Sequence, residues 1–200
     1  MLTDLRAESD DLDAVLDGAG PDALDKPTPA DGWSIGLTVG HLWFYDIEGR
    51  RALEQPDEFV AGLEGLFDDP ADYFERHNET IRSLGDALVP SWRAARAGII
   101  DAIAAADPTA RVPWYGPSMS LMSFGTARLM ETWAHGQDIA DALGVRRVPT
   151  DRLRHIAYIG FNARPFSYAV RGQEMPDVPV FVALTSPNGA EWTWGGPSAR

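Results

Sequence analysis

The segment that most constrains the fold is residues 120–144, SLMSFGTARLMETWAHGQDIADALG. Leu121, Phe124 and Ala127 recur at helical spacing, which predicts one long helix with an apolar face turned to a core. Glu131 and His135 continue this stripe at i and i+4, so their polar groups can meet. Because a carboxylate and an imidazole in an apolar interior need compensation, the pair either binds a divalent metal or forms a hydrogen bond within the helix at a bundle edge.

Composition and charge exclude several classes of function. The 200 residues are 44% hydrophobic, which suits a globular core. Thirty acidic residues against 17 basic ones give a net charge of -13, which argues against nucleic acid and anionic membrane surfaces as partners. No apolar run is long enough for a membrane helix, and the N-terminal sequence is acidic without an apolar signal core. We therefore expect a cytoplasmic protein.

The absence of cysteine limits the chemistry further. The chain contains no cysteine, so disulfides, thiolate metal ligands and cysteine nucleophiles are excluded. Any sulfur chemistry needs a thiol from outside the chain.

Helical signals indicate a mainly α-helical protein, with a four-helix bundle over residues 1–148. The first expected helix is capped by Thr3 and ends at Gly18 or Gly20, and the second is capped by Ser34 and ends at about residue 54. The third covers residues 70 to about 106, bent or split at Pro90, and the fourth covers residues 120–144. His77 lies among charged residues in the third of these, so we expect it at the surface.

Residues 149–200 change character. A fifth helix is expected from residue 150 or 151 to about Val170, kinked at Pro165. Strands at 178–185 and 191–194 are joined by a turn at 187–189, which predicts a β-hairpin. Since two strands are not stable alone, they either pack on helices or a partner, or begin a C-terminal α/β element that continues beyond residue 200.

A third ligand for a metal is available on the second helix. His41 lies well inside that helix, where it is either a core histidine with a hydrogen bond or a ligand. With Glu131 and His135 it gives a set of two histidines and one carboxylate, which leaves a position open for water or substrate. Zinc, iron, nickel and manganese all accept such a set. Asp138, one turn beyond His135, is either a group that orients its ring or an ordinary polar residue.

Other residues are candidates for lining a thiol or substrate pocket, with simple packing as the alternative for each. Two lie in the loop before the metal-bearing helix and three on the fifth helix: Trp114, Tyr115, His155, Arg164 and Tyr168. The guanidinium of Arg164 suits a carboxylate.

Three segments carry a resemblance to a known family: PTPADGWSIGLTVGHLWFYD, ARLMETWAHGQDIADALG and HIAYIGFNARPFSYAVRG. Over roughly residues 3–172 the chain resembles the DinB-like metal-binding superfamily, in its actinobacterial branch with the N-terminal domain of mycothiol-dependent maleylpyruvate isomerase. The resemblance implies a four-helix bundle, a divalent metal, most often zinc, held by His41, Glu131 and His135, and mycothiol as co-substrate. The isomerase also uses residues of a C-terminal domain that have no match here, so isomerase activity itself does not transfer.

Three functions remain open from the sequence. One is a metal-dependent transferase or isomerase that adds a small-molecule thiol, as a metal-bound thiolate, to an electrophilic substrate. The others are a non-catalytic metal- or ligand-binding module and a hydrolase that uses metal-bound water. The oligomeric state is open, a homodimer included.

Overall fold

The protein is mainly helical, with a short antiparallel strand pair near the C-terminus, and both features agree with the sequence prediction. The computed structural model describes residues 1–63, 66 and 69–196. The chain divides into two compact units, Met1–Arg147 and Val148–Arg200. Within the described residues, every helix is too short or too polar to cross a membrane.

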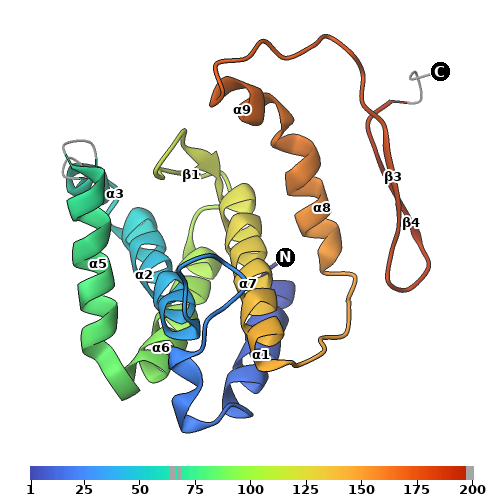
Figure 1. Ribbon diagram of the computed structural model, residues 1–200. Helices are drawn as coiled ribbons and strands as arrows, with labels where there is room; N and C mark the ends of the chain where they lie inside the picture. Colours follow the sequence, from blue (N-terminus) through green and yellow to red (C-terminus); the bar gives the residue numbers. More distant parts are fainter. Residues whose placement is uncertain (64–65, 67–68, 197–200) are drawn as a thin grey trace. The chain divides into compact units, whose positions relative to one another are not determined.

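The first unit is a bundle of four helices (Figure 1). They are α1 (Leu2–Asp17), α2 (Ile35–Glu54), α6 (Leu88–Ala105) and α7 (Leu121–Leu143). Helix α2 packs against α6 and α7, and α1 packs against α7 and α6. The bundle therefore brings the middle of α2 beside α7, although the two are far apart in sequence.

Shorter elements surround these four helices. They are η1 (Pro21–Asp25), α3 (Pro56–Gly62), α5 (Pro70–Leu84), η2 (Gly85–Ala87), β1 (Arg111–Val112) and β2 (Met119–Ser120). Helices α3 and α5 both pack against α2. Strands β1 and β2 pair antiparallel, and β2 leads directly into α7.

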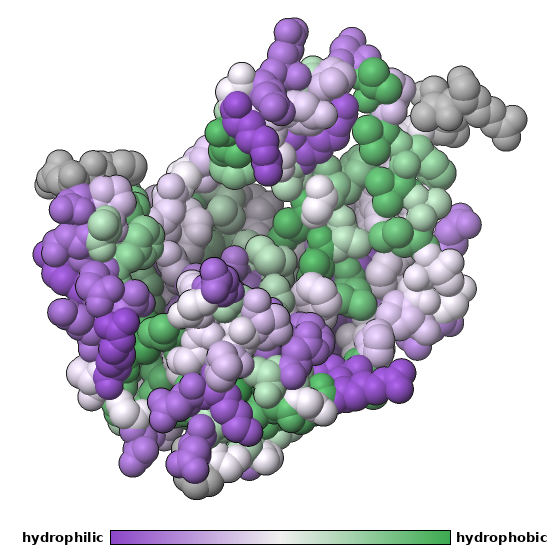
Figure 2. All heavy atoms as spheres, in the orientation of Figure 1, coloured by the Kyte–Doolittle hydropathy of each residue, from purple (hydrophilic) through white to green (hydrophobic). Residues whose placement is uncertain are grey.

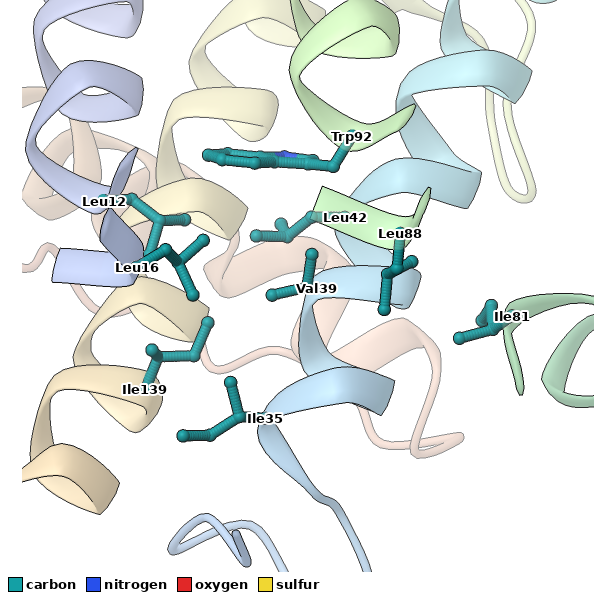
Figure 3. Packing of buried hydrophobic residues seen from close by; sticks show 9 residues of the cluster. All are labelled: Leu12, Leu16, Ile35, Val39, Leu42, Ile81, Leu88, Trp92 and Ile139. Atoms are coloured by element: carbon teal, nitrogen blue, oxygen red, sulfur yellow. The ribbon is translucent and has the colours of Figure 1, made fainter. Parts of the chain in front are cut away.

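A hydrophobic cluster joins five helices of this unit (Figure 3). Its buried members are Leu12, Leu16, Ile35, Val39, Leu42, Ile81, Leu88, Trp92 and Ile139. Burying a side chain of this size contributes about 1.5–3 kcal/mol. Such a cluster fixes α2 and α7 relative to each other, which is what a shared site between them requires.

The ends of the two site-bearing helices follow from local chemistry. The Ser34 hydroxyl accepts a hydrogen bond from the Leu37 backbone N–H and begins α2 as predicted. Ser120 does the same for the Ser123 N–H at the start of α7. Gly144 ends α7 at a φ of 68°, a conformation that favours glycine.

Two predictions about the helix ends of the first unit are wrong. Helix α1 begins at Leu2 with Met1 as its N-cap, two residues before the expected Thr3 cap. The region after Pro70 breaks at Gly85, where φ is 47°, and not at Pro90. Pro90 is tolerated in the first turn of α6, because the N–H groups of a first turn have no partner within the helix. Helix α5 consequently lies outside the bundle, with hydrophilic residues over its outer face (Figures 1 and 2).

The second unit contains α8 (Leu153–Asn162), α9 (Arg164–Ala169), β3 (Val182–Thr185) and β4 (Glu191–Trp194). The expected fifth helix starts later than predicted and is interrupted at Ala163, before Pro165. The hairpin turns at Gly189, where φ is 84°, and β3 is shorter than the predicted strand. Hydrophobic side chains of this unit are exposed, as the face in Figure 2 shows, and Phe181 and Leu184 are among the exposed residues.

Candidate metal centre

Three ligand-type side chains converge between α2 and α7. Nε2 of His41 lies 3.2 Å from Oε2 of Glu131, and Nε2 of His135 lies 3.4 Å from the same oxygen. One ligand atom from each residue can be chosen so that all three lie within 4.8 Å of one another. The structure thus brings together the three residues that the sequence singled out.

These side chains line an accessible edge of the bundle and not its core. Their exposed fractions are 23% for His41, 29% for Glu131 and 20% for His135. The fully buried face of α7 carries Arg128 and Thr132 instead. The predicted stripe of α7 is buried at Leu121 and Phe124, but its polar members Glu131 and His135 lie at the edge of the core and are open to a ligand.

The electrostatic surroundings favour the forms that bind metal. Burial lowers the pKa of His41, assisted by His135 and Arg128 and opposed by the hydrogen bond to Glu131. Burial opposes ionisation of Glu131, but hydrogen bonds with His135 and His41 and the charge of Arg128 hold its pKa well below the ordinary value. A neutral imidazole and an ionised carboxylate are the states a divalent cation requires.

Two further residues hold the histidine rings. Oδ2 of Asp138 lies 3.3 Å from Nδ1 of His135, in position to orient that ring. The indole of Trp33 stacks on His135, with centroids 5.7 Å apart and planes 4° apart, and meets His41 edge-on at 5.2 Å. Sequence reasoning missed Trp33, although its place one residue before the Ser34 cap puts it beside the start of α2.

A buried ion-pair cluster lies on the inward side of the same helices, and sequence reasoning missed it as well. Asp46 is fully buried and pairs with Nε of Arg96 at 2.9 Å and with Nη2 of Arg128 at 3.2 Å. Burial lowers the pKa of Arg96 to about 10, with Asp46 opposing the shift. The cluster holds one more positive than negative charge, which helps to keep Glu131 ionised.

Trp114 and Tyr115 lie beside the site in an aromatic cluster. Trp114 stacks on Phe59 at 5.6 Å and meets Tyr45 at 5.9 Å, while Tyr115 meets Tyr45 at 5.3 Å. Tyr45 in turn lies 4.6 Å from the ring of His41. The ring of Tyr45 thus lies between the two loop residues and the candidate ligand His41. A role for Trp114 and Tyr115 in closing a pocket stays a prediction.

A cavity of about 430 Å³ adjoins one candidate ligand, His41, on the α5 side. His41 and Tyr45 line it from α2, and His77 lines it from α5. His77 was expected among solvated charges, and that expectation is wrong: it is half-buried, with ring centroids 3.9 Å from Phe44 and 4.3 Å from Tyr73.

The remaining predicted pocket residues belong to the second unit. Nη2 and Nη1 of Arg164 donate to the backbone oxygens of Pro176 at 3.1 Å and Val178 at 3.3 Å. The same guanidinium lies 5.8 Å from the centre of the Tyr168 ring. His155 lies half-buried on α8. A role for these three residues in ligand binding stays a prediction.

The fold and site define a helical-bundle protein with a candidate divalent-metal site between two of its helices. The chain belongs to the family of the mycothiol maleylpyruvate isomerase N-terminal domain, whose model matches residues 5–140. All three candidate ligands fall inside the matched segment. The family predicted from sequence motifs is thereby confirmed.

Two relatives come from Mycobacterium tuberculosis: Uncharacterized protein Rv0036c of strain ATCC 25618 / H37Rv and Uncharacterized protein MT0041 of strain CDC 1551 / Oshkosh. Each is 39% identical to the chain over 199 residues, covering 99% of the chain and 77% of the relative. No solved structure gives a significant match.

Proposed function

We propose that the chain binds one divalent metal through His41, Glu131 and His135 and acts as a thiol-dependent transferase or isomerase on a small electrophile. The observation that carries the proposal is the convergence of these ligand atoms, within 4.8 Å of one another, from two helices that the core holds together. The family supports a small-molecule thiol as co-substrate, with mycothiol as the first candidate.

The donor set fits a catalytic metal. Two imidazole nitrogens and a carboxylate oxygen suit zinc and leave coordination positions free. The same donors accept nickel, iron and manganese, and zinc is our first choice because its catalytic sites use this combination. Asp138 would hold the ring of His135 in place through its Nδ1.

A metal in this position would lower the pKa of a bound thiol, so that the reactive thiolate forms at neutral pH. The thiol must come from outside, because the chain has no cysteine. The protein's own residues hold the metal, orient its histidine ligands and wall the site with aromatic rings. We expect this chemistry in the cytoplasm, where small thiols are kept reduced.

Metal stoichiometry tests the ligand assignment. Protein purified without chelator or metal-affinity tag is dialysed against zinc and analysed for metal content. We expect about one zinc per chain, lost in Glu131→Ala and His135→Ala and retained in His77→Ala, the matched histidine control. Wild-type protein that stays free of zinc, nickel, iron and manganese, or equal binding by Glu131→Ala, would show the assignment to be wrong.

A further inference from the structure

The cavity between α2 and α5 extends the candidate metal centre toward His77. At about 430 Å³ its volume is within the range of small-molecule sites. One candidate ligand, His41, and one residue with no role in the proposed metal site, His77, line the same space. A molecule bound here would reach both.

Aromatic and aliphatic groups form the walls of this cavity. Trp33, Phe44, Tyr45 and Phe74 all line it. Such walls favour a flat molecule, because ring faces and edges stack on planar surfaces. The walls therefore select for shape and not for charge.

The polar groups of the cavity are almost entirely uncharged. Among the described residues that line it, only Arg82 carries a fixed charge. Its Nη1 donates to Oε1 of Glu75 at 2.8 Å, and the side chain is 55% exposed. In the metal-free protein an uncharged ligand fits this lining better than an ion does, since Arg82 is already paired with Glu75 and no other charged side chain of the lining could balance the ion.

His77 is the polar group that the metal site does not use. Surrounding protein atoms enclose its Nδ1, so Nε2 is the ring nitrogen that remains for a ligand in the cavity. Burial lowers the pKa of His77, while a hydrogen bond with the Tyr73 backbone opposes the shift. In a neutral imidazole one nitrogen donates a hydrogen bond and the other accepts one. A ligand hydroxyl can donate to the ring or accept from it, so it can pair with either tautomer.

We propose that this cavity binds a planar, uncharged molecule with its hydroxyl group hydrogen-bonded to His77 and its opposite end beside His41. The assignment rests on the proposed function in one respect: the end beside His41 is where a thiol would react. It names the substrate class as an aromatic or conjugated compound that carries a hydroxyl. The binding step itself needs no metal.

Binding of 2-naphthol tests the subsite on chelator-treated protein, followed by fluorescence titration. 2-Methoxynaphthalene has the same ring system without the hydroxyl donor. We expect saturable binding of 2-naphthol and about a tenfold loss of affinity in His77→Phe, the loss typical of one buried hydrogen bond. Thr80→Val, which removes an exposed hydroxyl on the same helix, should bind as wild type does.

The outcomes separate this subsite from the metal site. No saturable binding, or equal affinities in wild type and His77→Phe, overturns the subsite while the metal stoichiometry still decides the proposed function. If His77→Phe does not fold, the imidazole NMR signals of His77 in wild-type protein decide: a shift on adding 2-naphthol that 2-methoxynaphthalene does not reproduce supports the subsite. Signals that stay in place contradict it.

Discussion

Nε2 of His41 lies 3.2 Å from Oε2 of Glu131, although 90 positions separate them in the chain. The contact joins α2 to α7 at the accessible edge of a bundle whose core contains Leu42 and Ile139 from the same two helices. The backbone that carries the candidate ligands is therefore fixed by packing. A metal would need only side-chain adjustment to be bound, and not movement of a helix.

Asp138 should matter for metal affinity without being a ligand. Its carboxylate lies 3.3 Å from Nδ1 of His135, and removing such an orienting group typically costs 10–100-fold in metal affinity. We expect Asp138→Asn to weaken zinc binding by about this factor, measured by competition with a chromogenic chelator. Asp141→Asn is the matched control, since Asp141 accepts from Gln137 on the exposed face of α7. Equal losses of zinc affinity in both variants would show that Asp138 does not orient His135.

Asp46 should be essential for folding. It is fully buried between Arg96 and Arg128, and removing it would leave two buried guanidinium groups without a counter-charge. We expect Asp46→Ala to lower the free energy of unfolding by about 3–5 kcal/mol in urea titrations. Glu54→Ala breaks the exposed pair with Arg50 and should cost at most about 1 kcal/mol. A similar small loss for Asp46→Ala would contradict the cluster's structural role.

Acid should destabilise the metal-free protein, in part through His77. Burial holds the pKa of this imidazole below its ordinary value of 6.5. As pH falls through 6.5, the unfolded chain takes up a proton before the folded chain does, so the free energy of unfolding decreases toward the lower, folded pKa. Urea unfolding of chelator-treated protein above and below pH 6.5 measures this loss.

His77→Phe removes the part of this acid-induced loss that comes from His77. The part that comes from His41, whose pKa is also lowered by burial, remains. The variant should therefore lose less stability on acidification than wild type does. An identical loss in the two proteins would show that His77 titrates alike in the folded and unfolded states.

Local spacing explains what the sequence could predict. Glu131 and His135 are i and i+4 on one helix, so their meeting follows from helix geometry alone. The Ser34 cap and the Gly144 terminus are equally local. Placing His41 beside them depends on the packing of α2 on α7, which the sequence indicated through the predicted helix bundle and the family resemblance and not through local spacing.

The missed features depend on tertiary context. Asp46 interrupts a buried stripe of α2 that includes Val39 and Leu42, the same kind of signal that drew attention to Glu131. His77 lies between Tyr73 and Ile81, both buried, and this i, i+4, i+8 pattern indicates an inward face. The charged residues next to His77 in sequence concealed that pattern.

Cobalt-substituted protein tests most directly whether an external thiol binds a metal held by His41, Glu131 and His135. Thiolate ligation to cobalt gives an intense near-ultraviolet charge-transfer band. Titration with mycothiol should raise this band to saturation and release about one proton per site, and Glu131→Ala should show neither change. A spectrum that mycothiol and other small thiols leave unchanged would contradict the account and leave metal-activated water or a non-catalytic role in its place.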